Sequence, residues 1–107
     1  MTPPGPVGAE ARRILGRYLR ELREAAGLDT HEAGALSTVD QSTVSRVERG
    51  YHRPGREVLG RLIGTYRPSE ADRAHVYRLW SRSWLPSEAR GLWLDLGPDG
   101  RPLGPRR

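Results

Sequence analysis

Residues 40–50 combine hydrogen-bonding side chains with the pattern of a short helix. The segment reads DQSTVSRVERG, so an acidic residue that can cap a helix precedes it and a glycine that can end it follows. Val44 and Val47 lie three residues apart and are predicted to face inward, which leaves polar and basic side chains outside. Amide, hydroxyl and guanidinium groups on such a helix can hydrogen-bond to base edges and phosphates in the major groove of DNA. The segment therefore predicts a helix that reads nucleic acid.

The charge of the chain agrees with this interpretation. The 107 residues carry a formal net charge of +5, from 18 basic against 13 acidic side chains. All 18 basic residues are arginine, which the base composition of a GC-rich genome also explains, so their positions are more informative than their number. Residues 41–61 contain five arginines and two glutamates. A basic stripe around a candidate reading helix is typical of DNA-binding proteins.

The composition argues against several other classes of protein. Cysteine is absent, so disulfides and thiolate metal sites are excluded. His31, His52 and His75 are scattered without helical ligand spacing, and we expect neither a metal nor a cofactor. No apolar run approaches the roughly 20 residues that cross a bilayer, and residues 1–6 do not resemble a secretion signal. We expect a cytoplasmic, nucleoid-associated protein. Nucleophile–base sets and glycine-rich phosphate loops are not visible, so we do not expect an enzyme.

Apolar residues recur at three- and four-residue steps in five segments, which predicts five amphipathic helices in one all-α domain over residues 9–84. The expected helices cover residues 10–26, 30–36, 41–49, 56–66 and 69–84. Asp29 and Glu32 have the spacing of a reciprocal capping box at the start of the second helix.

Both ends of the chain differ in character from this domain. Residues 1–8 are rich in proline and glycine, and we expect a disordered arm. Residues 85–107 are expected to form a short tail that is either irregular or a small hairpin around the turn at 98–100. Pro102 weakens the second strand of such a hairpin.

Two stretches carry a family resemblance: LRELREAAGL at residues 19–28 and QSTVSRVERG at residues 41–50. Together with the short second and third helices, they resemble the Xre family of phage repressor and Cro-like helix-turn-helix proteins. The run LIGTY at residues 62–66 is similar to the end of the DNA-binding half in actinobacterial members. The resemblance covers residues 12–66 and implies a five-helix, lambda-repressor-like domain that regulates transcription by binding specific double-stranded DNA.

The resemblance also implies which side chains contact DNA, with the helix at 41–49 in the major groove. Those that would reach base edges, or in part phosphates, are Gln41, Ser42, Thr43 and Arg46. Those that would contact the sugar-phosphate backbone or the minor groove are Thr30, Arg53 and Arg56. An ordinary solvated surface position is the alternative for five of them: Gln41, Ser42, Thr43, Arg53 and Arg56.

Other residues have structural roles in this fold. Arg23 and Glu48 match positions that form a buried or half-buried ion pair between the first and third helices. Ser37 and Thr38 stand where the family has a leucine and a glycine, and a non-glycine residue in a left-handed turn costs about 1–2 kcal/mol. We therefore expect either a rebuilt turn or a second helix that ends one residue sooner.

An aromatic stripe near the end of the chain suggests a contact with another molecule. The family resemblance implies a homodimer on two-fold half-sites. The candidate dimer or partner contacts are Tyr77, Trp80, Trp84 and Trp93. Such a stripe is also common in a core. The alternative function is a protein-interaction module, antitoxin-like or an anti-regulator, that uses residues 69–84 and the Trp-rich tail.

Overall fold

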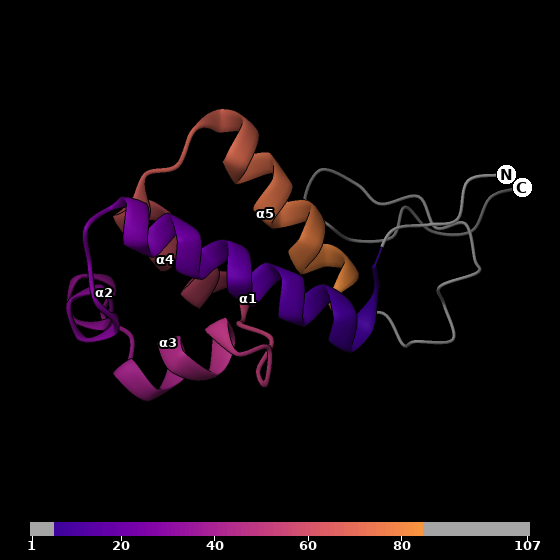
Figure 1. Ribbon diagram of the computed structural model, residues 1–107, viewed down its shortest axis with the longest axis horizontal. Helices are drawn as coiled ribbons and strands as arrows, with labels where there is room; N and C mark the ends of the chain where they lie inside the picture. Colours follow the sequence, from indigo (N-terminus) through magenta and orange to yellow (C-terminus); the bar gives the residue numbers. More distant parts are fainter. Residues whose placement is uncertain (1–5, 85–107) are drawn as a thin grey trace, which may run out of the picture.

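The computed structural model describes residues 6–84, which form five α-helices and no strand (Figure 1). The helices are α1 (Gly8–Ala25), α2 (Thr30–Ser37), α3 (Gln41–Glu48), α4 (Arg56–Tyr66) and α5 (Glu70–Arg82). The predicted all-α fold with a short second and third helix is confirmed. The expected tail at 85–107, including Trp93 and the alternative hairpin, lies outside the described residues.

The longest helix, α1, organises the packing. It lies between α5 on one side and α3 on the other, while α2 contacts both α3 and α4 (Figure 1). Its buried positions recur at helical spacing, and Leu15 and Leu19 are each 1% exposed. The other large, fully buried apolar side chains come from α3, α4 and α5, and they are Val44, Val47, Leu59, Leu62 and Val76. One continuous core therefore fixes all five helices relative to each other.

The start of α1 differs from the sequence prediction. The helix begins at Gly8, and Val7 before it is only 3% exposed, so the folded domain starts earlier than the arm expected at residues 1–8 allows. Burial of the apolar Val7 side chain is favourable, and this explains the early start although prolines and glycines surround Val7 in the sequence. At the other end, α5 stops at Arg82, two residues before the expected boundary.

Hydrogen bonds at the helix starts explain several boundaries. The Asp29 side chain accepts from the Glu32 backbone N–H at 2.7 Å, and the Asp29 backbone N–H donates to the Glu32 side chain at 3.0 Å. This is the predicted capping box. Ser69 caps α5 by accepting from the Asp72 backbone N–H. Asp40 occupies the expected position before α3, but its side chain makes no capping hydrogen bond.

The turn between α2 and α3 keeps a left-handed residue without a glycine. α2 continues to Ser37, and Thr38 follows with φ 57° and ψ 46°. The helix therefore does not end sooner, and Thr38 takes on the strain that a glycine would avoid. A hydrogen-bonded group stabilises the same region: Ser37, 4% exposed, donates through its hydroxyl to Thr65 Oγ1 at 2.8 Å, and Thr65 donates to the Arg61 carbonyl at 3.0 Å. Ser37 thus satisfies its buried hydroxyl where the family has an apolar leucine.

Candidate nucleic-acid interface

The outer face of α3 carries the side chains that were predicted to contact DNA. Val44 and Val47 are each 1% exposed and hold the inner face in the core. Gln41, Ser42 and Arg46 are exposed on the other side. Thr43 is half-buried, and like Ser42 it makes no side-chain hydrogen bond among the described residues. The helix therefore offers an amide, hydroxyls and a guanidinium to solvent from one rigid element.

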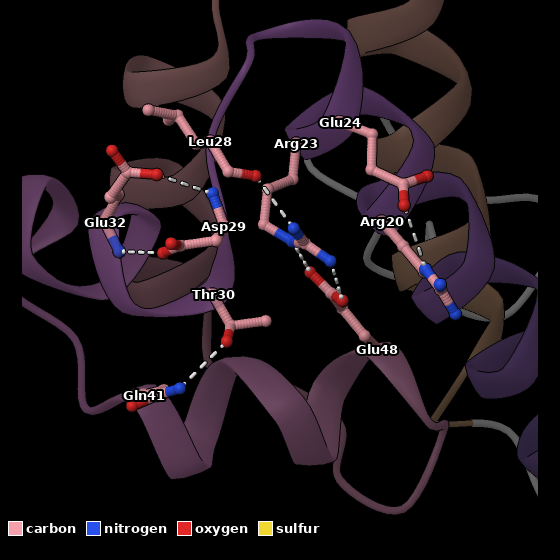
Figure 2. Close-up of polar contacts among 9 residues, drawn as sticks. All are labelled: Arg20, Arg23, Glu24, Leu28, Asp29, Thr30, Glu32, Gln41 and Glu48. Carbon is pink, nitrogen blue, oxygen red and sulfur yellow. Dashed lines mark hydrogen bonds and ion pairs between the residues drawn. The ribbon is translucent and has the colours of Figure 1, made fainter.

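Thr30 and Gln41 lie next to each other, as Figure 2 shows. Gln41 Nε2 donates to Thr30 Oγ1 at 3.0 Å, which joins the first residue of α2 to the first residue of α3. The second amide hydrogen and the amide oxygen of Gln41 remain available, and the Thr30 hydroxyl still has a hydrogen to donate. The contact therefore orients Gln41 and leaves one amide hydrogen and the amide oxygen free for another partner.

The ion pair that the resemblance implied between Arg23 and Glu48 is present (Figure 2). Arg23 Nε lies 2.7 Å from Glu48 Oε2, and Arg23 Nη2 lies 3.0 Å from Glu48 Oε1. A third donor, Nη1, reaches the Leu28 carbonyl at 2.8 Å. The hydrogen bonds to Glu48 raise the pKa of the Arg23 guanidinium. The pair ties α1 to the last turn of α3 and takes no part in the exposed face.

A close approach of the two backbones adds to this connection. A Cβ on Gly16 would lie 2.4 Å from the Val47 carbonyl oxygen and 2.5 Å from that of Glu48. Only glycine fits between α1 and α3 at this separation. The position of α3 is therefore set by backbone contact as well as by the ion pair.

Arg53 has a different role from the predicted backbone or minor-groove contact. Its Nε donates to Ser83 Oγ at 2.8 Å, and Nε and Nη2 reach the Trp80 carbonyl at 3.3 and 3.2 Å. Its Cζ also lies 4.1 Å from the centre of the Trp80 ring, a cation–π distance. Burial lowers the pKa of the Arg53 guanidinium. We therefore revise Arg53 from a DNA contact to a structural link between the loop after α3 and the end of α5.

The aromatic stripe of α5 is divided between core and surface. Trp80 is 8% exposed, and its indole N–H donates to the Pro54 carbonyl at 2.8 Å, so the idea that Trp80 forms an intermolecular contact is wrong for this structure. Its ring fills the space beside Arg53 because both the ring face and the N–H find partners there. Tyr77 is half-buried and packs edge-on against Trp80. Trp84 is 45% exposed and stays a candidate contact.

The charges around α3 leave a basic surface uncompensated. Among the described residues, Arg46, Arg49 and Arg56 are exposed and make no ion pair or side-chain hydrogen bond. Of the two glutamates nearby, Glu48 is held by Arg23, and Glu57 by Arg61 at 2.6 Å. These three cationic groups are therefore available to an external anion.

The structure adds three residues that sequence reasoning did not select. Ser45 and Arg49 follow Ser42 at three and seven residues, so they share its outward stripe, and that spacing was readable from the sequence. Tyr51, in the loop after α3, is 77% exposed, an unusual state for an aromatic side chain. No sequence signal distinguishes Tyr51 from a buried loop residue.

The described residues contain neither a candidate metal site nor a membrane-spanning helix. Groups of three or more His, Cys, Asp or Glu side chains that could hold a metal ion do not occur in residues 6–84. In the same range, every helix is too short or too polar to cross a bilayer.

Comparisons with known proteins agree with this geometry. A family model described as a helix-turn-helix domain matches residues 14–76. The restriction-modification controller protein C.AhdI from Aeromonas hydrophila is similar, with 31% identity and a TM-score of 0.54 over 60% of this chain and 96% of that one. The clp gene regulator ClgR from C. glutamicum has 28% identity and a TM-score of 0.57 over 77% and 97%.

The wild-type restriction-modification controller protein C.Esp1396I has a TM-score of 0.54 over 71% of this chain and 94% of that one. At 13% identity this likeness shows the fold alone. No curated protein sequence gives a significant match. Since the family model spans more than half of the 107 residues, the chain belongs to the helix-turn-helix domain family, of the phage repressor and Cro type.

Proposed function

We propose that this helix-turn-helix DNA-binding protein regulates transcription by reading a specific duplex sequence in the major groove with α3. The observation that carries the proposal is the outer face of α3. There, exposed Gln41, Ser42 and Arg46 stand on a helix fixed by the core, beside arginines that have no ion pair within residues 6–84. The similarity to C.AhdI and ClgR, a controller protein and a gene regulator by name, supports a regulatory role.

The Thr30–Gln41 contact supports a specific mode of reading. A glutamine that pairs with adenine uses its amide oxygen and one amide hydrogen, and Gln41 keeps both available while its other amide hydrogen binds Thr30. The Thr30 hydroxyl can donate to a phosphate at the start of α2. A phosphate, Thr30, Gln41 and a base would then form one chain of hydrogen bonds, so the position of the backbone would fix the orientation of the base-reading amide.

Selection of bound duplexes from a random library, at two salt concentrations, tests the proposal. We expect an enriched motif and a steep fall of affinity with salt. Arg46→Ala should cost about 1–3 kcal/mol of binding free energy and relax the preference at one base pair. Arg73→Ala is the matched control, because Arg73 is exposed on α5, across α1 from α3, and makes no ion pair among the described residues (Figure 1). Wild-type protein that enriches no motif in dilute buffer would refute sequence-specific reading.

We also infer that two copies bind two-fold related half-sites, about one helical turn apart. The exposed Trp84 at the end of the described domain supports a contact surface there. Sedimentation at high micromolar concentration measures the association directly. A strictly monomeric mass, both alone and with a two-site duplex, would contradict this inference.

The same exposed Trp84 favours the second function, a protein-interaction module that uses α5. The two functions are separated by substitution. If Trp84→Ala abolished a protein complex while Arg46→Ala left DNA binding unchanged, the interaction module would be the better description.

A further inference from the structure

The exposed side of α1 carries a row of arginines. Arg13, Arg17 and Arg20 follow each other at four and three residues, so they lie on one stripe of the helix, and all three are exposed. Arg20 forms an exposed ion pair with Glu24 at 3.4 Å. Arg13 and Arg17 make no ion pair or side-chain hydrogen bond among the described residues, and Glu21, four residues after Arg17, is not bonded to it. We call Arg13 and Arg17 the α1 arginine pair.

The α1 arginine pair lies beside the end of α3. Gly16, the buried residue before Arg17, lies so close to α3 that a Cβ on it would meet the Val47 and Glu48 carbonyls. Arg13, one turn before Gly16 in α1, makes a similar close approach. A Cβ on Gly50 would lie 2.8 Å from Arg13 Cα and 2.7 Å from Arg13 Cγ. The stem of Arg13 therefore packs on Gly50, the residue that follows the exposed Arg49.

Exposed arginines lie on both sides of the contact between Arg13 and Gly50. Arg46 belongs to α3 and Arg49 follows its last residue, while the α1 arginine pair stands on the neighbouring helix, with Arg13 against Gly50. Glu48, the acid at the same place, points to Arg23 and is neutralised there. Four guanidinium groups on adjoining surfaces, without a partner in residues 6–84, raise the local positive potential, which suits a polyanion with regularly spaced charges.

We propose that the α1 arginine pair and Arg49 form a second phosphate-binding surface, which contacts the DNA backbone beyond the C-terminal end of α3. This inference rests on the proposed function and extends it, because it adds α1 to the surface that holds the duplex. The contacts would strengthen binding and lengthen the footprint without selecting a sequence, since phosphates carry no base identity.

The experiment compares Arg13→Gln/Arg17→Gln with wild type on the selected duplex and on an unrelated duplex. Glutamine keeps most of the stem that packs on Gly50 and removes the charge. Loss of two phosphate contacts should reduce the slope of log affinity against log salt by about 1.8. The affinity gap between variant and wild type should then grow about twelvefold between 200 and 50 mM salt, on both duplexes. Arg13→Lys/Arg17→Lys should retain the wild-type slope.

The double variant Arg73→Gln/Arg78→Gln is the matched control. Both arginines are exposed on α5, and the control lowers the net charge by the same amount as the α1 variant. We expect the wild-type slope for this control. Phosphate ethylation should also lose inhibitory positions at one edge of the footprint in the α1 variant alone. The inference is overturned if the α1 variant keeps the wild-type slope or if the α5 control loses as much slope. A selected motif with an unchanged slope refutes only the α1 surface, whereas a lowered slope without any motif refutes only sequence-specific reading.

Discussion

Removal of Arg23 should destabilise the domain more than removal of any exposed arginine. In Arg23→Met the apolar stem is kept, but the Glu48 carboxylate loses both short contacts and the Leu28 carbonyl loses its donor. The side chains of the pair are only 10% and 9% exposed, so water can replace few of the lost hydrogen bonds. Breaking a buried pair in this way costs about 3–5 kcal/mol. Because small domains are stable by roughly 5–15 kcal/mol, the variant should lose a large fraction of its free energy of unfolding.

Urea unfolding followed by circular dichroism measures this effect. The matched control is Arg20→Met, which breaks an exposed pair whose side chains are 62% and 54% exposed and should cost about 0.2–1 kcal/mol. Glu48→Leu alone should be as damaging as Arg23→Met, because it leaves a stranded cation. The double variant should be more stable than either single variant, since two apolar side chains leave no buried charge. Equal losses for Arg23→Met and Arg20→Met, or an additive double variant, would refute this reasoning.

Three further changes have expected outcomes in the same unfolding assay. Thr38→Gly should stabilise the domain by up to about 1 kcal/mol, because the exposed Thr38 is left-handed at φ 57°; a loss would show that its side chain matters. Gly16→Ala should cost about 1–3 kcal/mol or more and weaken DNA binding, because the new Cβ meets the Val47 carbonyl; wild-type stability would refute the close approach. Burial raises the pKa of Tyr66 to about 12, above the value near 10 of an unfolded tyrosine. Stability should therefore be full below pH 10 and fall between pH 10 and 12, and Tyr66→Phe should reduce that fall.

The helices of this chain were predictable because the signals that indicate them, hydrophobic spacing and capping residues, lie within a few residues of each other in the sequence. Apolar residues at three- and four-residue steps, such as Leu15 and Leu19, predict both a helix and its buried face. The capping box at Asp29 and Glu32 predicts where α2 begins, and the structure confirms it. Val7 shows the limit of this reasoning. Val7 is 3% exposed, although its neighbours in sequence are turn-forming prolines and glycines that do not indicate a buried position.

The candidate site was predictable in its residue types and less so in its contacts. The spacing of Val44 and Val47 indicates which side of α3 is exposed, and this exposed side is where Gln41 and Arg46 lie. The contacts of a long side chain in a loop depend on residues that are distant in the sequence. Arg53 has the same local pattern as a fully exposed arginine, and only the position of Trp80, 27 residues later, shows that its guanidinium is bound within the fold.

The contacts of Arg53 give α5 a part in fixing the position of α3. The start of α3 is linked to α2 through Gln41 and Thr30, and its end is held by Arg23 and by the close approach at Gly16. The loop that follows is held by Arg53 on the last turn of α5. A strained Thr38 between α2 and α3 is therefore tolerated, because the orientation of α3 is set mainly by elements other than that turn. A change in how α5 packs would therefore act on the end of α3 through this loop.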